Sequence, residues 1–184
     1  MKILLLIMAG TLPVTVPAYE RAFEKTPAGI IEIKTLPERT VLIAQRDQSY
    51  FDENNDMFMN LFRYIQKNDV AMTVPVKAEI DPGKMYFYVG EKDLTKKLKD
   101  SEYVRVRVEP EQTVLSMGIR GGYSEKNFEQ ARKKLFDQLE ASKEWKPSGP
   151  AYAVYWNGPY VPGFMKQFEV HTPVEPKRKV EQNE

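Results

Sequence analysis

Apolar residues recur at helical spacing in two segments of the chain. In the first segment they occupy positions 58, 61, 62 and 65, and in the second positions 128, 131, 135 and 139. Spacings of three and four residues place these side chains on one face of an α-helix, which predicts two amphipathic helices. Ser124 lies just before the second stripe and is a favourable N-cap residue.

Eight further runs have the hydrophobic pattern of β-strands. The valines at positions 104, 106 and 108 alternate with charged residues, which is typical of a half-buried strand. The sequence Asp81-Pro82-Gly83 is a strong turn signal between two of the runs. The expected strands are residues 30–34, 40–45, 71–80 and 84–89 before the chain midpoint, and 103–108, 113–119, 151–156 and 167–174 after it.

A short repeat relates the two halves of the chain. The segment PERTVL at 37–42 matches PEQTVL at 110–115 at five of six positions. Each segment lies within a predicted β-β-α-β-β unit, and neither unit alone covers both its helix and its sheet. We therefore expect one α+β domain: a distorted eight-stranded β-barrel with two helices, built from internally duplicated halves.

The two ends of the chain differ in composition from this domain. Residues 1–18 combine Lys2, an apolar run and small residues near Ala18, which is typical of a secretory signal peptide. The alternatives are an uncleaved membrane anchor or an unusual first strand. Residues 175–184 are charged and lack aromatics, so we expect a flexible tail. The domain then spans residues 19–174, and the protein is expected to be periplasmic or secreted.

The composition excludes several kinds of chemistry. There is no cysteine and one histidine, which excludes disulfides, thiolate metal sites and covalent haem attachment. The net charge of +1 lacks the basic excess of a nucleic-acid-binding protein. No nucleotide-binding glycine loop or nucleophile elbow occurs. The sequence thus indicates a binding protein without nucleic-acid partner, without stable membrane insertion after signal cleavage, and without catalysis.

Two acidic motifs are candidates for metal binding. Residues 52–56 begin like a calcium loop, but Met57 and Arg63 occupy the positions that require glycine and glutamate. Carboxylates near a helix N-terminus explain this segment better. His171 shares its strand face with Glu169, opposite Phe168 and Val170, and we expect that face to be solvated.

Three segments resemble those of the SOUL haem-binding protein family. They are residues 63–65 with 68–76 (RYI and NDVAMTVPV), Gly121-Gly122-Tyr123, and residues 155–170 (YWNGPYVPGFMKQFEV). They occur in the family's order across residues 19–174. The resemblance implies a duplicated, distorted barrel that binds haem or another tetrapyrrole, as a carrier and not as an established enzyme. Without cysteine, the haem is expected to be b-type and non-covalent.

The resemblance also implies a ligand groove beside the first helix. Matching that helix gives Phe58, Met59, Phe62 and Arg63 as candidate tetrapyrrole contacts. Aromatic and methionine side chains suit a porphyrin face, and an arginine suits its propionates. The sequence does not fix the iron ligand, because no histidine precedes the first helix. The alternatives are no side-chain ligand, a tyrosine or methionine, and His171.

The sequence leaves two other interpretations. The SOUL fold is similar to the effector-binding domains of bacterial drug-responsive regulators, which hold cationic ligands with a buried glutamate. The chain is then a stand-alone small-molecule binding domain for hydrophobic or cationic ligands. The second alternative is an interaction module without a small ligand, which would lack an apolar pocket with convergent polar groups.

Overall fold

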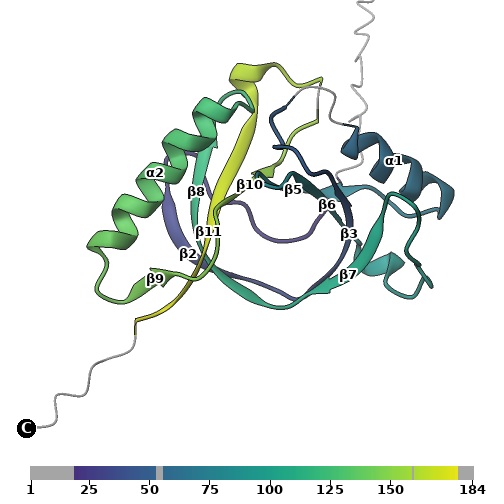
Figure 1. Cartoon of the computed structure of the whole chain (residues 1–184), viewed down its shortest axis with the longest axis horizontal. Helices are drawn as coiled ribbons and strands as arrows, with labels where there is room; N and C mark the ends of the chain where they lie inside the picture. Colours follow the sequence, from purple (N-terminus) through teal and green to yellow (C-terminus); the bar gives the residue numbers. More distant parts are fainter. Residues whose placement is uncertain (1–18, 53–55, 159, 178–184) are drawn as a thin grey trace, which may run out of the picture.

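Eight strands form one curled antiparallel sheet, seen end-on in Figure 1. The computed structural model describes residues 19–52, 56–158 and 160–177. The predicted signal peptide and residues 178–184 of the predicted tail lie outside these ranges. In spatial order the strands are β2 (Ile31–Leu36), β8 (Gln112–Arg120), β11 (Gln167–Pro176), β10 (Tyr152–Tyr155), β5 (Val76–Glu79), β6 (Lys84–Tyr88), β3 (Arg39–Gln45) and β7 (Arg105–Glu109).

This sheet confirms the expected α+β fold, in the form of a half barrel whose end strands are β2 and β7. The strand order is symmetric about the central β10–β5 pair, since β2 lies beside β8 and β7 lies beside β3. Each half of the chain therefore contributes its first strand to the other half's part of the sheet. Descent of the two halves from one duplicated segment stays a prediction.

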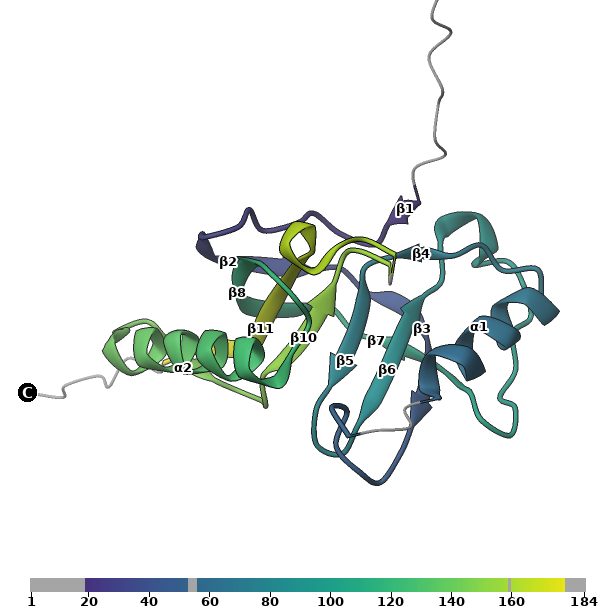
Figure 2. The ribbon, with the colours of Figure 1, turned by 90° about the horizontal axis from the view of Figure 1, so that it is seen from above.

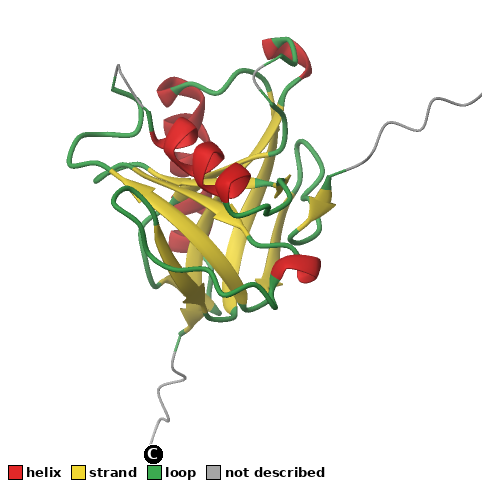
Figure 3. Ribbon diagram, turned by 90° about the vertical axis from the view of Figure 1, so that its right-hand side faces the viewer, coloured by secondary structure: helices red, strands yellow, loops and turns green. Residues whose placement is uncertain are grey.

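Both helices lie on the outer, convex face of the sheet, as Figures 1 and 2 show. Helix α1 (Met57–Lys67) packs on β3 and β6, and α2 (Glu125–Ala141) packs on β8, β11 and the short strand β9 (Trp145–Pro147). Figure 3 shows α1 crossing the strands behind it. Among the described residues, no helix has the length and hydropathy needed to cross a membrane.

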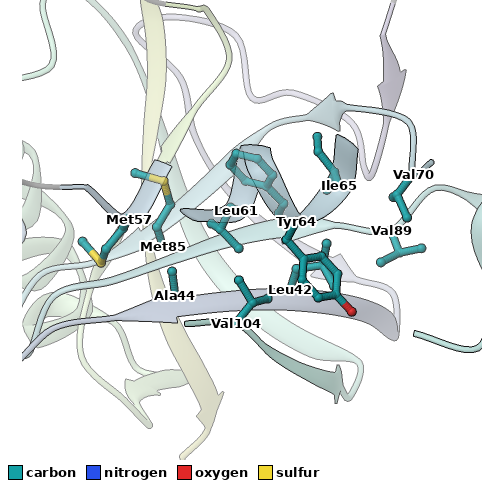
Figure 4. Close-up of a cluster of buried hydrophobic side chains, with 11 residues drawn as sticks. Leu42, Ala44, Met57, Leu61, Tyr64, Ile65, Val70, Met85, Val89 and Val104 are labelled. Carbon is teal, nitrogen blue, oxygen red and sulfur yellow. The ribbon is translucent and has the colours of Figure 1, made fainter. Parts of the chain in front are cut away.

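The predicted helical stripes form two separate cores beneath the helices. Under α2, the four stripe residues 128, 131, 135 and 139 are all buried, and Ser124 accepts the cap hydrogen bond from the Asn127 N–H. Under α1, Leu61 and Ile65 are buried among residues of β3 and β6 (Figure 4). Asp56 is the N-cap residue of α1, as predicted for a carboxylate at a helix N-terminus, but its side chain makes no cap hydrogen bond. Residues 53–55 of the acidic segment lie outside the described residues.

Residues 22–29, which we call the strap, cross the concave face of the sheet. In Figure 1 this purple segment runs inside the curl. It follows β1 (Glu20–Arg21), which pairs in parallel with β4 (Thr73–Val74), and the Gly29 N–H donates to the Gly118 carbonyl at 2.9 Å. A side chain at Gly118 would place Cβ 2.2 Å from the Pro27 oxygen, so the close approach of the strap requires glycine there.

The last strand extends beyond its predicted end. Strand β11 continues to Pro176, and its last residues pair with β9. The Lys177 N–H then donates to the Glu144 carbonyl at 2.7 Å. The strand predicted to end at residue 174 therefore runs two residues further, because pairing with β9 supplies backbone hydrogen bonds that composition alone does not reveal.

Candidate functional site

A groove of about 520 Å³ lies between α1 and the segment 97–104 that leads into β7. The helix contributes Arg63, Tyr64 and Lys67 to its lining. The opposite wall contributes lysines at positions 97 and 99, together with Tyr103 and Val104. Its volume falls within the range of about 300–1,000 Å³ that is usual for small-molecule sites.

The groove wall opposite the helix is held in place by polar contacts and by the core. Val104 is buried in the α1 core cluster, close to Tyr64 (Figure 4). The Tyr64 hydroxyl donates to the Lys99 carbonyl at 2.7 Å. Asp100 accepts a hydrogen bond from the Val106 N–H at 2.8 Å. These contacts fix the distance between helix and wall, so the groove is part of the folded structure.

The charges around the groove favour an anion. Arg63, Lys67, Lys97 and Lys99 line it, and within the described part of the chain none of them forms an ion pair. Asp100 is neutralised by Arg107, 3.0 Å away. The Val106 N–H and the Arg107 guanidinium both lower the pKa of Asp100, so it stays ionised and paired. Glu102 is the other carboxylate of the lining, so the four cations leave a net positive charge that attracts an anionic ligand.

The four contacts implied by the resemblance do not converge in this groove. Arg63 lines it and is exposed. Phe58 and Phe62 lie on another flank of α1, with their rings stacked at 6.0 Å, and Phe58 also packs on Phe87 at 5.4 Å. Met59 is 44% exposed and is not among the lining residues. Positions 58 and 62 share one helix face and positions 59 and 63 share another, about 100° away, so the four side chains do not point into one site.

Other residues that line the groove were not predicted from the sequence. Lys67 lies four residues after Arg63 and therefore on the same helix face, a signal that spacing alone could have provided. Tyr64 was hidden within the core face of α1. Tyr103 and the lysines come from a segment 30 or more residues away, and only the tertiary fold brings them to the helix.

A second polar cluster lies on the concave face, around Glu169 and His171. Both side chains have an exposed fraction of 0%, so the expected solvated face is wrong. The alternation itself is confirmed, because Phe168 and Val170 pack under α2 and the other pair points to the concave side. The strap covers that side: Phe23 lies 5.9 Å from the His171 ring and 5.8 Å from that of Trp156.

The Glu169 carboxylate accepts five hydrogen bonds in this cluster. One oxygen accepts from the Thr26 N–H at 2.9 Å and the Trp156 indole at 2.6 Å. The other accepts from the Lys34 ammonium at 2.6 Å, the Ser116 hydroxyl at 2.9 Å and the His171 ring. Burial opposes ionisation, but these donors prevail and lower the pKa of Glu169 to about 2.

Both ring nitrogens of His171 have partners. Nε2 lies 2.6 Å from Glu169, and Nδ1 lies 3.3 Å from the Tyr152 hydroxyl. Burial lowers the pKa of His171, so the neutral ring donates from Nε2 and accepts at Nδ1. No group of three or more His, Asp or Glu in the described residues could hold a metal ion. The metal role considered for His171 stays a prediction, and it would require breaking these contacts.

Solved structures share this fold at low sequence identity. The EcmrR C-terminal domain matches with a TM-score of 0.58 and 15% identity, over 79% of this chain and 97% of that chain. EcmrR in a complex with DNA matches with a TM-score of 0.64 and 14% identity, over 79% of this chain but 57% of that chain. A hydrolase from Listeria innocua matches with a TM-score of 0.56 and 14% identity, over 82% of this chain and 94% of that chain. At such identities these likenesses show the fold and nothing about ligand or activity.

Sequence comparison gives a more specific result. No curated protein sequence matches this chain significantly. The sequence profile described as SOUL heme-binding protein, however, matches residues 14–173, which include α1, the groove and the curled sheet except for the last three residues of β11. The chain belongs to the SOUL heme-binding protein family.

Proposed function

We propose that this protein binds haem or another anionic tetrapyrrole, non-covalently, in the groove between α1 and segment 97–104. The observation that carries the proposal is the set of cations at positions 63, 67, 97 and 99, which line one groove without an ion pair in the described residues. Family membership supports a tetrapyrrole as the anion. The role is binding or transport of the ligand, and no catalytic step is proposed.

The groove supplies cations for the propionates of such a ligand, and Tyr103 is the exposed aromatic side chain of its described lining. Arg63 presents a planar guanidinium that pairs bidentately with a propionate, and Lys67 offers a second cation one turn along the helix. Tyr103 is 61% exposed and offers an aromatic ring to the porphyrin face. Bound haem would supply an iron centre. Ligand contacts by Phe58, Met59 and Phe62 stay predictions, since they lie outside the groove lining.

Titration with hemin and with metal-free protoporphyrin IX tests this proposal. Arg63→Ala should weaken binding of both ligands about ten- to a hundredfold, because a hydrogen bond to a charged group contributes about 1.5–3 kcal/mol. Lys67→Ala should weaken it less. Lys134→Ala is the matched control, since Lys134 is an exposed lysine on α2, away from the groove. Equal affinities for the Arg63 and Lys134 variants, or no binding by the unmodified protein, would contradict the proposal.

The concave face supports the alternative, a site for hydrophobic cations. Glu169 is a buried carboxylate with Trp156, Tyr152 and Phe23 near it, and anionic and aromatic groups together suit an organic cation. Lys34 already supplies a cation to that carboxylate and the strap covers it, so a ligand would have to displace both. We therefore favour the α1 groove.

Thermal-shift measurements separate the two candidates. Tetraphenylphosphonium should not stabilise the protein, whereas hemin should, by the linkage between binding and unfolding. Stabilisation by the cation and not by hemin, especially if Glu169→Gln removes it, would support the concave site instead.

Export of the protein is a further part of the proposal. It rests on the composition of residues 1–18. N-terminal sequencing of protein recovered from the periplasm or medium should begin near Tyr19. Recovery from the cytosol with Met1 or Lys2 at the N-terminus would contradict export.

A further inference from the structure

The loop between β10 and β11 exposes three large apolar side chains. Tyr160 is 98% exposed, Phe164 76% and Met165 53%. The last two belong to the short helix η2 (Gly163–Met165), which lies at the top of the molecule in Figures 1 and 3. Single exposed apolar side chains are normal on a protein surface, but three on one projecting loop indicate a contact surface.

The base of this loop is fixed by hydrogen bonds, so the exposure is a property of the fold. The Tyr123 hydroxyl donates to the Gln167 carbonyl at 3.0 Å and accepts from the Asn157 N–H at 2.9 Å. The Gln167 N–H donates to the Asn157 side-chain oxygen at 2.7 Å. Within the loop, the Met165 N–H donates to the Pro162 carbonyl at 2.9 Å. An ordered backbone therefore presents the apolar side chains to solvent.

Three cations lie around the base of the loop. Lys166 directly follows η2, and its ammonium lies 4.7 Å from the centre of the Tyr123 ring. Arg120 is exposed at the end of β8, opposite Gln167 in the sheet register. Lys25 of the strap donates to the side chain of the same glutamine. None of the three forms an ion pair with a described residue, so their charges are available to a partner.

Two exposed carboxylates adjoin these segments without cancelling the cations. Glu24 lies 3.9 Å from Arg21, and Glu125 is followed directly by the exposed Lys126. The base of the loop therefore has a local positive excess, although the whole chain has a net charge of only +1. Such an excess next to apolar side chains attracts the anionic surface of a membrane.

We propose that this loop contacts a bilayer that contains anionic phospholipid, with Tyr160, Phe164 and Met165 inserted at the headgroup level. Aromatic rings suit this interface, where the tyrosine hydroxyl stays hydrated. The cations at the base then meet lipid phosphates. A bilayer adapts to a projecting loop, whereas a stable protein–protein contact buries about 800 Å² of complementary surface on each partner. The contact is separate from the groove beside α1.

Co-sedimentation with vesicles tests this contact. Every protein compared has the same N-terminus, so differences report the loop and not residues 1–18. Binding should be tighter to vesicles of phosphatidylcholine with phosphatidylglycerol than to phosphatidylcholine alone, and added salt should reduce this difference. Phe164→Ser should lower the partition coefficient about tenfold, because it removes the apolar ring. Lys166→Gln should lower it about fivefold, on the anionic vesicles only.

Leu94→Ser and Lys92→Gln are the matched controls. Both residues are exposed, in or next to the short helix η1 (Glu91–Asp93), where Asp93 accepts from the Ala71 N–H beyond the end of α1. Both variants should bind vesicles like the unmodified protein. No binding to either vesicle, or equal binding by the Phe164 variant and the controls, would overturn the proposal. A dimer abolished by Phe164→Ser, with vesicle binding unchanged, would show an interface between copies instead.

A tryptophan placed on the loop reports its position directly. The emission of Phe164→Trp should shift to shorter wavelength with anionic vesicles and be quenched by brominated phospholipid, because the ring enters the bilayer. Leu94→Trp should show neither change. Each variant is compared with the unmodified protein, which supplies the signal of the two native tryptophans. Quenching of the residue 94 variant and not of the residue 164 variant would contradict a contact through this loop.

Discussion

Glu169 is fixed by five hydrogen bonds to its carboxylate. Its carboxylate is fully buried and neutralises the ammonium of Lys34 at 2.6 Å. Glu169→Gln would leave that ammonium beside a neutral amide. We expect the variant to lose about 3–5 kcal/mol of unfolding free energy, the usual cost of breaking a buried ion pair from one side.

Urea denaturation measures this loss. Glu140→Gln is the control, because Glu140 is exposed on α2 and should change the unfolding free energy by less than about 0.5 kcal/mol. A Glu169 variant as stable as the control would show that the ion pair contributes little.

The same cluster makes stability depend on pH. The folded protein holds the pKa of Glu169 near 2, against 4.5 without its partners, and holds the pKa of His171 below 6.5. In both cases the unfolded chain takes up a proton first as the pH falls. The contribution of both groups to the unfolding free energy is therefore fully present above pH 6.5. As the pH falls, protonation of His171 in the unfolded chain lowers stability first. Protonation of Glu169 then removes on the order of 3 kcal/mol between pH 4.5 and 2.

Unfolding free energies measured between pH 8 and 3 check this sign. His171→Gln should remove the decline in unfolding free energy that begins near pH 6.5 and keep the decline below pH 4.5. A protein that becomes more stable on acidification from pH 7 to 4 would contradict the assigned protonation states.

At the scale of elements, the packing of the strap on β8 depends on the absence of a side chain at Gly118. A Cβ at Gly118 would lie 2.2 and 2.4 Å from the carbonyl oxygens of Pro27 and Thr26, so Gly118→Ala must push the strap away. We expect a loss of about 1–3 kcal/mol, typical of overpacking. The Trp156 environment should change as well, because Phe23 packs on its ring.

Denaturation followed by tryptophan fluorescence tests the strap contact. Gly122→Ala is the matched control, since a Cβ at Gly122 meets nothing within 4 Å. Equal stability and equal fluorescence of the two variants would mean that the strap does not pack on β8 as described.

The sequence predicted the regular elements well, because each has a local periodic signal. Both helical stripes and the eight strands of the sheet form where alternation and spacing placed them, within a few residues. The strap and β9 were missed, since neither has a period of its own and each is ordered by contact with a distant strand. The prediction that His171 is solvated was wrong for the same reason. The strand face on which His171 lies was predicted correctly, but the strap that covers this face was not.

At the scale of the whole molecule, the half barrel separates two polar sites by a sheet. The convex side has an open groove whose cations lack described partners, and the concave side has a closed cluster whose carboxylate is fully satisfied. Matching to the family's first helix gave Arg63, which lines the groove, but also Phe58 and Phe62, which lie on another flank of that helix. The opposite wall was beyond sequence reasoning, because segment 97–104 meets α1 only in the folded chain.

The central claim is that the tetrapyrrole occupies the convex groove. Backbone amide chemical shifts recorded during titration with diamagnetic protoporphyrin IX test it most directly. We predict saturable shifts concentrated at residues 60–68 and 97–104, with little change in the strap or around Glu169 on β11. Shifts centred on the strap and residues 152–156, or no saturable shifts, would contradict the account.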